Sequence, residues 1–144
     1  TIYLNWTDTR NGDVDVFVTK SIDKGENWSD PVRVNDDPVG NGQPQFFSAM
    51  AVDPSDGSVN IVFFDRRDQP GTMTSLSLAR SVDGGESFRN IPIDLEPVEC
   101  VRGAFFGDYI GIDARDGNVV AAFPHFVAPR RLALSVAVFK FDKR

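Results

Sequence analysis

The sequence predicts an all-β fold and, within it, a partial β-propeller of about two and two-thirds four-stranded blades. Two observations lead to this prediction. An eight-residue pattern occurs twice, at 21–28 and 81–88. Short segments rich in β-branched and aromatic residues alternate with Gly, Pro, Asp and Asn, whereas no window of eleven or more residues carries a helical apolar stripe.

The repeat has a period of 60 residues. The segment 21–28 reads Ser-Ile-Asp-Lys-Gly-Glu-Asn-Trp, and 81–88 reads Ser-Val-Asp-Gly-Gly-Glu-Ser-Phe. A second pair, 52–59 and 112–119, shares Asp-x-x-Asp-Gly-x-Val at the same offset. Self-similarity of this kind indicates a supersecondary unit that is repeated along the chain.

Each unit is predicted to hold four strands, lettered A to D in chain order. The first unit contributes strands B, C and D at 2–7, 14–20 and 31–35, and 14–20 partly alternates apolar with polar residues. The second unit contributes A to D at 45–53, 59–65, 75–80 and 88–93, and the third contributes A, B and C at 107–113, 119–126 and 132–141. We expect one domain, 1–144, with blade portions at about 1–37, 43–95 and 104–144.

The repeated eight-residue pattern falls in the hairpin between strands C and D. Its Asp side chain can accept hydrogen bonds from the turn amides, and its Ser can supplement them. Its Gly can take a positive φ, and its aromatic residue can fold back over the turn. The residues concerned are Ser21, Asp23, Gly25 and Trp28 in one copy, and Ser81, Asp83, Gly85 and Phe88 in the other.

This pattern resembles the Asp box, or bacterial neuraminidase repeat, of sialidase-like propellers. With the Asp-Pro-x-Asp-Gly-x-Val turn at 53–59 and the Phe-Gly-Asp-Tyr-Ile-Gly segment at 106–111, the resemblance covers nearly the whole chain. It implies that the chain is a C-terminal portion of such a propeller and that the boxes are structural. It also implies a secreted or cell-envelope protein, although the first residues do not read as a signal peptide.

Strand polarity separates the loops into two rims. The A-to-B and C-to-D turns lie on one rim, and the B-to-C and D-to-A loops lie on the other. A looser repeat falls on the second rim: Trp-Thr-Asp-Thr-Arg at 6–10 matches Phe-Phe-Asp-Arg-Arg at 63–67. We therefore predict ligand contacts there. The candidates are Asp8, Arg10, Asp65, Arg66, Arg67, Arg102 and His125.

The sialidase resemblance implies an arginine clamp on a sugar carboxylate, an Asp acid/base and a Tyr activated by a Glu. Arg66 or Arg102 can serve as a clamp member, Glu99 with Tyr109 can form the Tyr–Glu pair, and Asp108 is a further catalytic candidate. The family's Arg-(Ile/Leu)-Pro motif is absent from this sequence. The alternative interpretations are ion pairs that brace the loops, a packed or channel-lining Tyr109, and a neutral polar contact for His125.

Composition limits the partners and cofactors. The 144 residues carry a net charge of −6, so nucleic acid is not an expected partner. No apolar run is long enough to predict a membrane span. One His and one Cys disfavour a zinc site, so no metal or other cofactor is predicted. Calcium at Asp36-Asp37 or near Asp113 and Asp116 is the alternative, but turn chemistry explains these residues better.

Three functions compete. The first is a noncatalytic carbohydrate- or protein-binding and assembly module, which the incomplete catalytic set favours. The second is part of an exo-sialidase or other glycoside hydrolase that acts on glycans. The third is self-association, because three blades do not close a ring comfortably: either N-terminal blades complete the propeller, or a homo-oligomer does.

Overall fold

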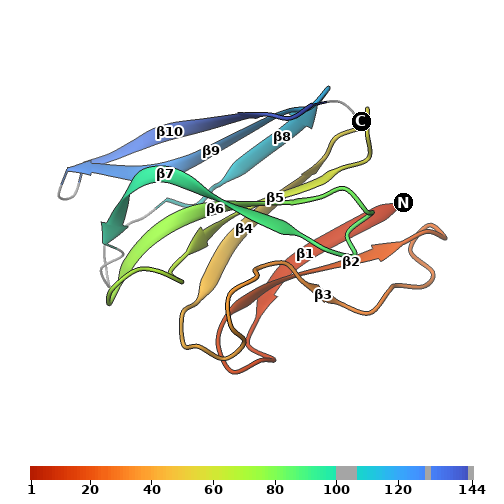
Figure 1. The fold of residues 1–144 in the computed structure, drawn as a ribbon, viewed down its shortest axis with the longest axis horizontal. Coiled ribbons are helices and arrows are strands. Elements are labelled where there is room, and N and C mark those ends of the chain that lie inside the picture. The colour runs from red at the N-terminus through yellow and green to blue at the C-terminus, as the bar shows by residue number, and fades with distance from the viewer. Residues whose placement is uncertain (100–106, 129–130, 143–144) are drawn as a thin grey trace.

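The computed structural model describes residues 1–99, 107–128 and 131–142, and these form an all-β structure of ten strands in three antiparallel sheets (Figure 1). The first sheet holds β1 (Ile2–Asp8), β2 (Asp15–Ser21) and β3 (Val32–Arg33). The middle sheet holds β4 (Gln45–Val52), β5 (Val59–Asp65), β6 (Met73–Ser81) and β7 (Arg89–Glu99). The third sheet holds β8 (Gly111–Arg115), β9 (Asn118–Ala128) and β10 (Arg131–Lys140).

Neighbours in the sheets are neighbours in the chain. The strand orders are β1-β2-β3, β4-β5-β6-β7 and β8-β9-β10, as expected for successive hairpins. The prediction of an all-β fold is confirmed. The described residues contain no helix that could cross a membrane.

Two strands differ most from their predicted bounds. β7 continues past residue 93 to Glu99, because beyond a bulge it pairs with β6 again, with Thr74 opposite Val98. β8 begins at Gly111 instead of 107, because its pairing with β9 runs only from Gly111 to Arg115. β5 begins and ends where the sequence predicts.

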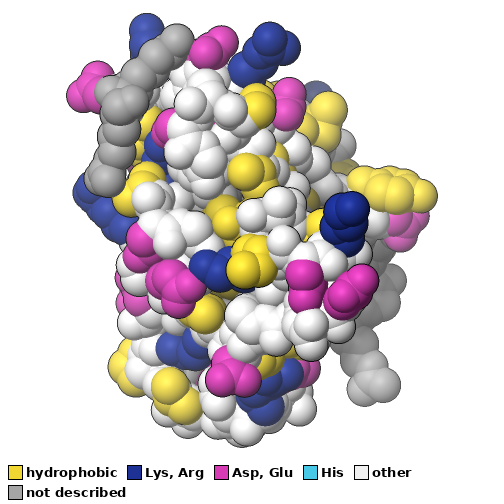
Figure 2. All heavy atoms as spheres, turned by 90° about the vertical axis from the view of Figure 1, so that its right-hand side faces the viewer, with side chains coloured by type: hydrophobic (Ala, Val, Ile, Leu, Met, Phe, Trp, Pro, Cys, Tyr) yellow, Lys and Arg dark blue, Asp and Glu magenta, His cyan; other side chains and the backbone are white. Residues whose placement is uncertain are grey.

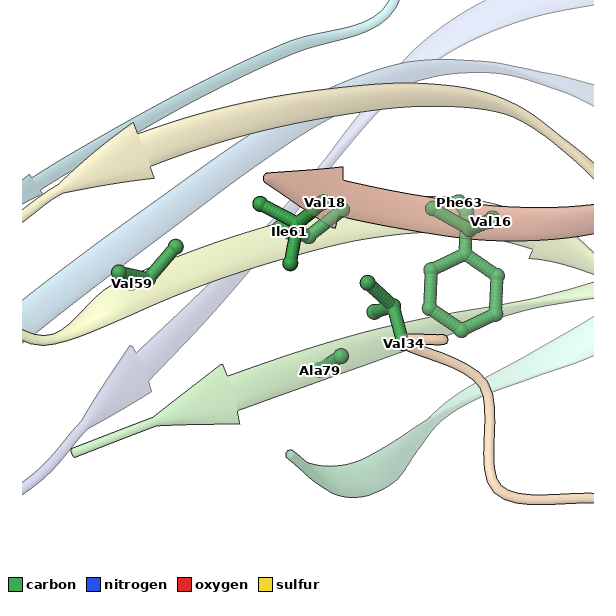
Figure 3. Close-up of a cluster of buried hydrophobic side chains, with 7 residues drawn as sticks. All are labelled: Val16, Val18, Val34, Val59, Ile61, Phe63 and Ala79. Carbon is green, nitrogen blue, oxygen red and sulfur yellow. The ribbon is translucent and has the colours of Figure 1, made fainter. Parts of the chain in front are cut away.

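The middle sheet lies between the other two sheets. The core between the first and middle sheets consists of Val16, Val18, Val34, Val59, Ile61, Phe63 and Ala79 (Figure 3). The core between the middle and third sheets contains Val62, Phe64, Leu76, Ile93, Ala121 and Phe123. All seven residues of β5 are therefore buried, because its two faces pack on different sheets.

The two Ser-x-Asp-x-Gly turns have the same hydrogen-bond geometry. In the first, Ser21 Oγ donates to Asp23 Oδ1 at 2.7 Å and accepts from the amide of Gly25 at 2.8 Å, and Asn27 N donates to Asp23 Oδ1 at 2.9 Å. Gly25 has a φ of 96°, and Gly85 in the second copy has a φ of 85°. These bonds, first those from Asn27, lower the pKa of Asp23 to about 2. The motif is thus a closed local turn.

The second turn also contacts the first sheet. Ser81 Oγ donates to Asp83 Oδ1 at 2.7 Å and accepts from Gly85 N at 2.9 Å. Lys20 Nζ, at the end of β2, donates to the carbonyl of Gly84 at 2.9 Å and pairs with Glu86 at 2.5 Å. This turn of the middle sheet therefore binds the adjoining sheet as well as stabilising its own hairpin.

Candidate functional site

The connections lie on two rims. The turn rim, on the right-hand side of Figure 1, carries the turns β2–β3, β4–β5, β6–β7 and β8–β9. The loop rim, on the opposite side, carries the connections β1–β2, β3–β4 and β5–β6. Figure 2 looks onto the turn rim, where acidic, basic and apolar side chains are interspersed over the described surface. Among the candidate residues for ligand contact, Asp8, Arg10, Asp65, Arg66 and Arg67 lie on the loop rim, whereas His125 lies within β9.

Asp8 and Arg10 form an exposed ion pair at the end of β1. Arg10 Nη2 lies 2.6 Å from Asp8 Oδ2, and the backbone amide of Arg10 donates to Asp8 Oδ1 at 3.0 Å. The guanidinium also lies over the ring of Phe17, at 4.4 Å from its centroid. The hydrogen bonds from Arg10 hold the pKa of Asp8 well below its usual range. Asp8 is consequently a carboxylate at neutral pH and cannot donate a proton as a general acid.

Asp65 and Arg67 repeat this arrangement in a buried setting. Arg67 N donates to Asp65 Oδ1 at 3.0 Å, and Arg67 Nε donates to Asp65 Oδ2 at 2.6 Å. Arg67 Nη1 pairs with Asp36, and Nη2 donates to Asn90 Oδ1 at 2.8 Å. Asp65 is 1% exposed. Because these bonds occupy Nε and both Nη groups, Arg67 braces the loop and has little capacity left for a ligand.

A buried polar network continues from Asp65 into the first sheet. Asn35 Nδ2 lies 2.7 Å from Asp15 Oδ1, 2.7 Å from Asp37 Oδ1 and 2.6 Å from Gln45 Oε1. Gln45 Nε2 in turn lies 3.2 Å from Asp65 Oδ1. The network therefore joins the start of β2, the β3–β4 connection and the end of β5.

Arg33 supplies positive charge to this network. Its Nη2 lies 2.7 Å from Asp15 Oδ1 and 3.0 Å from Asp37 Oδ1. Burial of Asp15 opposes its ionisation, but the bonds from Arg33 and Asn35 outweigh this and lower its pKa. Sequence reasoning missed Arg33, Asn35 and Asp15. The only signal was the Asn-Asp-Asp run at 35–37, and which side chains it meets depends on tertiary packing.

A cleft of about 380 Å³ opens beside this network. Pro92, Ile93 and Leu95 of β7 form its apolar side, and its polar lining includes Asp36, Asp65, Arg67, Ser77, Asn90 and Asp94. Ser77 Oγ donates to Asp65 Oδ2 at 2.7 Å, so this wall too is internally paired. The cleft therefore presents an acidic, already hydrogen-bonded surface, which is a poor site for an anion.

Arg66 differs from its neighbours on the loop rim. Its Nε donates to Thr74 Oγ1 at 3.0 Å, and its guanidinium lies over the ring of Phe46, 5.3 Å from the centroid. No carboxylate of the described residues forms an ion pair with it. Arg66 is thus a positioned guanidinium whose charge is not neutralised within the described part of the chain.

The ring beneath Arg66, that of Phe46, belongs to a stacked aromatic cluster. Phe46 and Phe47 both stack on Phe64, with ring centroids 5.8 Å apart in each pair. Phe47 has a φ of 54°, in the left-handed region, at the bulge where β4 loses register with β5. A bulky residue in this conformation is strained and occurs at sites that the surrounding structure holds in place. At this bulge both Phe46 and Phe47 stack on Phe64, and Phe46 carries the guanidinium of Arg66 over its ring.

The remaining candidates are less organised. Tyr109 is 86% exposed and Asp108 is also exposed. Thr72 Oγ1 lies 3.5 Å from Glu99 Oε1, and no hydrogen bond joins Glu99 to Tyr109 among the described residues. His125 Nε2 lies 3.4 Å from the carbonyl of Glu96. Arg102 lies outside the described residues.

Metal ligands do not converge in the part of the chain that the structure describes. No group of three or more His, Cys, Asp or Glu side chains there could hold an ion. Asp37 accepts instead from Arg33 and from Asn41 Nδ2, the latter at 2.7 Å. The carboxylate of Asp37 is therefore satisfied by a guanidinium and an amide group.

Comparison with known proteins identifies a fold and not a family. No protein-family model matches the chain, and no curated protein matches its sequence. Among solved structures, the Hadza microbial sialidase Hz136 is similar with a TM-score of 0.61 and 20% identity, over 90% of this chain and 29% of that chain. The chain therefore spans less than a third of that sialidase, and the likeness concerns the all-β, sialidase-like fold.

Two trans-sialidases match more loosely. The intramolecular trans-sialidase from Ruminococcus gnavus, in complex with oseltamivir carboxylate, gives a TM-score of 0.49 and 12% identity, over 98% of this chain and 31% of that chain. The leech intramolecular trans-sialidase, complexed with 2,7-anhydro-Neu5Ac, gives 0.46 and 13%, over 97% and 22%.

Proposed function

We propose that this chain is a noncatalytic binding module that recognises a carboxylate-bearing glycan on its loop rim. The observation that carries the proposal is Arg66, a guanidinium held by Thr74 and Phe46 without an acidic partner among the described residues. A guanidinium binds a carboxylate through two parallel hydrogen bonds, and an aromatic surface beside it suits the apolar face of a sugar. The sialidase-like fold supports an acidic sugar as the ligand class.

The other described arginines of the rim support this choice by contrast. Arg10 is paired with Asp8, and Arg67 with Asp65 and Asp36. A ligand carboxylate would have to displace these acids, at the cost of leaving them unpaired. Arg66 carries no such competition from a described residue, so it is the preferred anion contact.

Catalysis is the alternative, and the rim chemistry favours it less. A glycosidase places two carboxyl groups across one bond, one of them protonated to act as an acid. Asp8 is ionised by its contact with Arg10, and Asp65 is occupied by Arg67 and Ser77. Asp108, Glu99 and Tyr109 remain as the candidate catalytic set for a glycoside hydrolase.

Calorimetric titration with 3′-sialyllactose and lactose tests the proposal, because the two sugars differ by the acidic residue. We expect sialyllactose to bind and lactose to bind more weakly. Arg66→Gln should weaken sialyllactose binding by about tenfold to a hundredfold, since a hydrogen bond to a charged group contributes roughly 1.5–3 kcal/mol. Arg89→Gln is the matched control, because Arg89 is an exposed arginine at the other end of the sheet, where β7 begins.

Equal affinity for the two sugars, or an Arg66→Gln variant that binds like the parent chain, would contradict the proposal. The catalytic alternative has its own readout. Release of a fluorophore from a 4-methylumbelliferyl sialoside, lost in Asp108→Asn but retained in Asp113→Asn, would assign a hydrolase instead.

A further inference from the structure

The outward face of the third sheet is apolar and uncovered. On β10, Leu134, Val136 and Val138 alternate with residues that face the core, and Val136 and Val138 are 57% and 69% exposed. Val120 on the neighbouring β9 pairs with Val138 and is exposed on the same face. A cluster of branched apolar side chains on one sheet face indicates a surface that is covered by a partner.

The internal repeat indicates what such a face contacts. Leu76 and Leu78 on β6 stand 60 residues before Val136 and Val138. They are only 2% and 0% exposed, because the third sheet covers them. The same position in the first sheet is occupied by Val16 and Val18, which the middle sheet covers. In two of the three sheets this face therefore binds the next sheet.

The first sheet leaves uncovered the type of face that, in the middle sheet, packs on the preceding sheet. Ile2 and Leu4 on β1 are 44% and 51% exposed. The repeat of the β1 segment, offset by 57 residues, aligns them with Val59 and Ile61 of β5. Val59 and Ile61 are fully buried, in the core that the middle sheet shares with the first sheet (Figure 3). Inside the chain, the type of face that carries Val136 and Val138 packs on the type of face that carries Ile2 and Leu4. The chain thus leaves one face of each type uncovered, the first on the third sheet and the second on the first sheet.

The turn between β6 and β7 contacts the first sheet, and the equivalent residues elsewhere in the repeat do not make this contact. Phe88 packs against the core that the first and middle sheets share, whereas its counterpart Trp28 is 40% exposed. Lys20 reaches forward from β2 to Glu86 in the turn of the middle sheet. In the repeat, Lys140 stands 120 residues after Lys20, and Glu26 stands 60 residues before Glu86. Lys140 and Glu26 are therefore the equivalent pair. Both are exposed, and neither has an ion-pair partner among the described residues.

We propose that two copies of this chain associate head to tail, with the first sheet of one copy packed on the third sheet of the other. Ile2, Leu4 and Trp28 of one copy cover Val120, Leu134, Val136 and Val138 of its partner. Lys140 of one copy pairs with Glu26 of the other, as Lys20 pairs with Glu86 within the chain. Apolar faces and opposite charges are both matched, which gives the contact its direction.

Two copies are also a favourable number for closure. A head-to-tail contact either closes into a ring or continues as a filament. Two chains of three sheets each supply six, within the range of about four to eight sheets that closed propellers contain. We therefore expect a closed dimer in which each uncovered face meets its counterpart.

Sedimentation velocity and multi-angle light scattering of the 144-residue chain test this proposal across a series from low to high micromolar concentration. We expect a mass that rises from the 15.9 kDa of one chain to that of two chains. Val138→Asp should weaken the association at least about tenfold, because it buries an unpaired carboxylate in the contact. Val39→Asp is the control, since Val39 is also an exposed apolar residue, 63% exposed, but lies in the β3–β4 connection.

Charge reversal provides a second measurement that does not depend on the apolar face. Lys140→Glu should weaken association, and mixing it with Glu26→Lys should restore it between the two variants, because each variant supplies the charge that the other has lost. A chain that remains monomeric at every concentration would overturn the proposal. So would a dimer that tolerates both Val138→Asp and Leu4→Asp, because its contact would then lie elsewhere.

Discussion

Asp53 ties the middle sheet to the third sheet, and replacing it by alanine tests how much this link contributes to stability. Its Oδ2 accepts from Gly117 N at 2.8 Å, and its Oδ1 accepts from Asp116 N at 3.2 Å. Ser55 N and Oγ also donate to Oδ1, at 2.8 and 2.7 Å. Asp53 is fully buried; its bond from Gly117 is buried, and those from Asp116 and Ser55 are partly buried.

The expected cost of Asp53→Ala follows from these contacts. The Ser55 groups belong to the same turn and can find other partners. The amide of Gly117 is buried and that of Asp116 is partly buried, and a polar group left unsatisfied costs roughly 1–3 kcal/mol. We therefore expect the free energy of unfolding to fall by about 2–4 kcal/mol, measured by urea denaturation.

The repeat offers a matched control. Asp113 stands 60 residues after Asp53, but it is exposed, and within the described part of the chain it accepts only from the adjacent amide of Ala114, at 2.9 Å. Asp113→Ala should change the stability by less than about 0.5 kcal/mol, as surface substitutions do. Equal, small losses in the two variants would refute the idea that the buried carboxylate holds the two turns together.

Two further predictions concern the same turns. Gly117→Ala should lower the free energy of unfolding by about 3 kcal/mol, measured by thermal unfolding, because Gly117 has a φ of 78° and an added Cβ would clash with the carbonyl of Phe141. Gly57→Ala, at the equivalent position with a φ of 73°, has open space around the added Cβ and should lower it by only about 1 kcal/mol. Burial opposes ionisation of Asp53, but bonds first from Gly117 outweigh it and lower its pKa to about 2 from 3.8. A carboxylate with a lowered pKa stabilises the folded state above pH 3.8, and this contribution is lost as the pH falls through 2. The difference in stability between the parent chain and Asp53→Ala should therefore narrow over this pH window. A difference in urea midpoints that stays constant would contradict this.

Local sequence signals predicted the strands well. The β-branched and aromatic content of 59–65 predicts β5 with its observed bounds, and the two Ser-x-Asp-x-Gly segments predict turns with positive φ at Gly25 and Gly85. β7 and β8 were less accurate, because their ends depend on pairing with strands elsewhere in the sheet. A strand end that is set by its partner leaves little trace in its own sequence.

The candidate site was predicted only in part. Asp8-x-Arg10 and Asp65-x-Arg67 look alike in sequence and share one local geometry, yet the first pair is exposed and the second is buried. The difference arises because Gln45, Asp36 and Asn90 reach Asp65 or Arg67 from other strands and loops. The sequence could not distinguish the two pairs, because each Asp-x-Arg motif predicts only the bonds between its own two residues.

The sequence by itself determined the repeat, the strand order and the turn chemistry, because these depend on residues only a few positions apart. Tertiary structure decided which charges are neutralised and which apolar faces are covered. Arg66 and Arg67 are adjacent in the chain, yet of the two only Arg67 meets carboxylates of the residues that the structure describes. Leu78 and Val138 occupy one repeat position, yet only Leu78 is buried. Pairing and burial depend on neighbours that the fold brings from tens of residues away, so only the folded chain distinguishes a brace from a candidate binding residue.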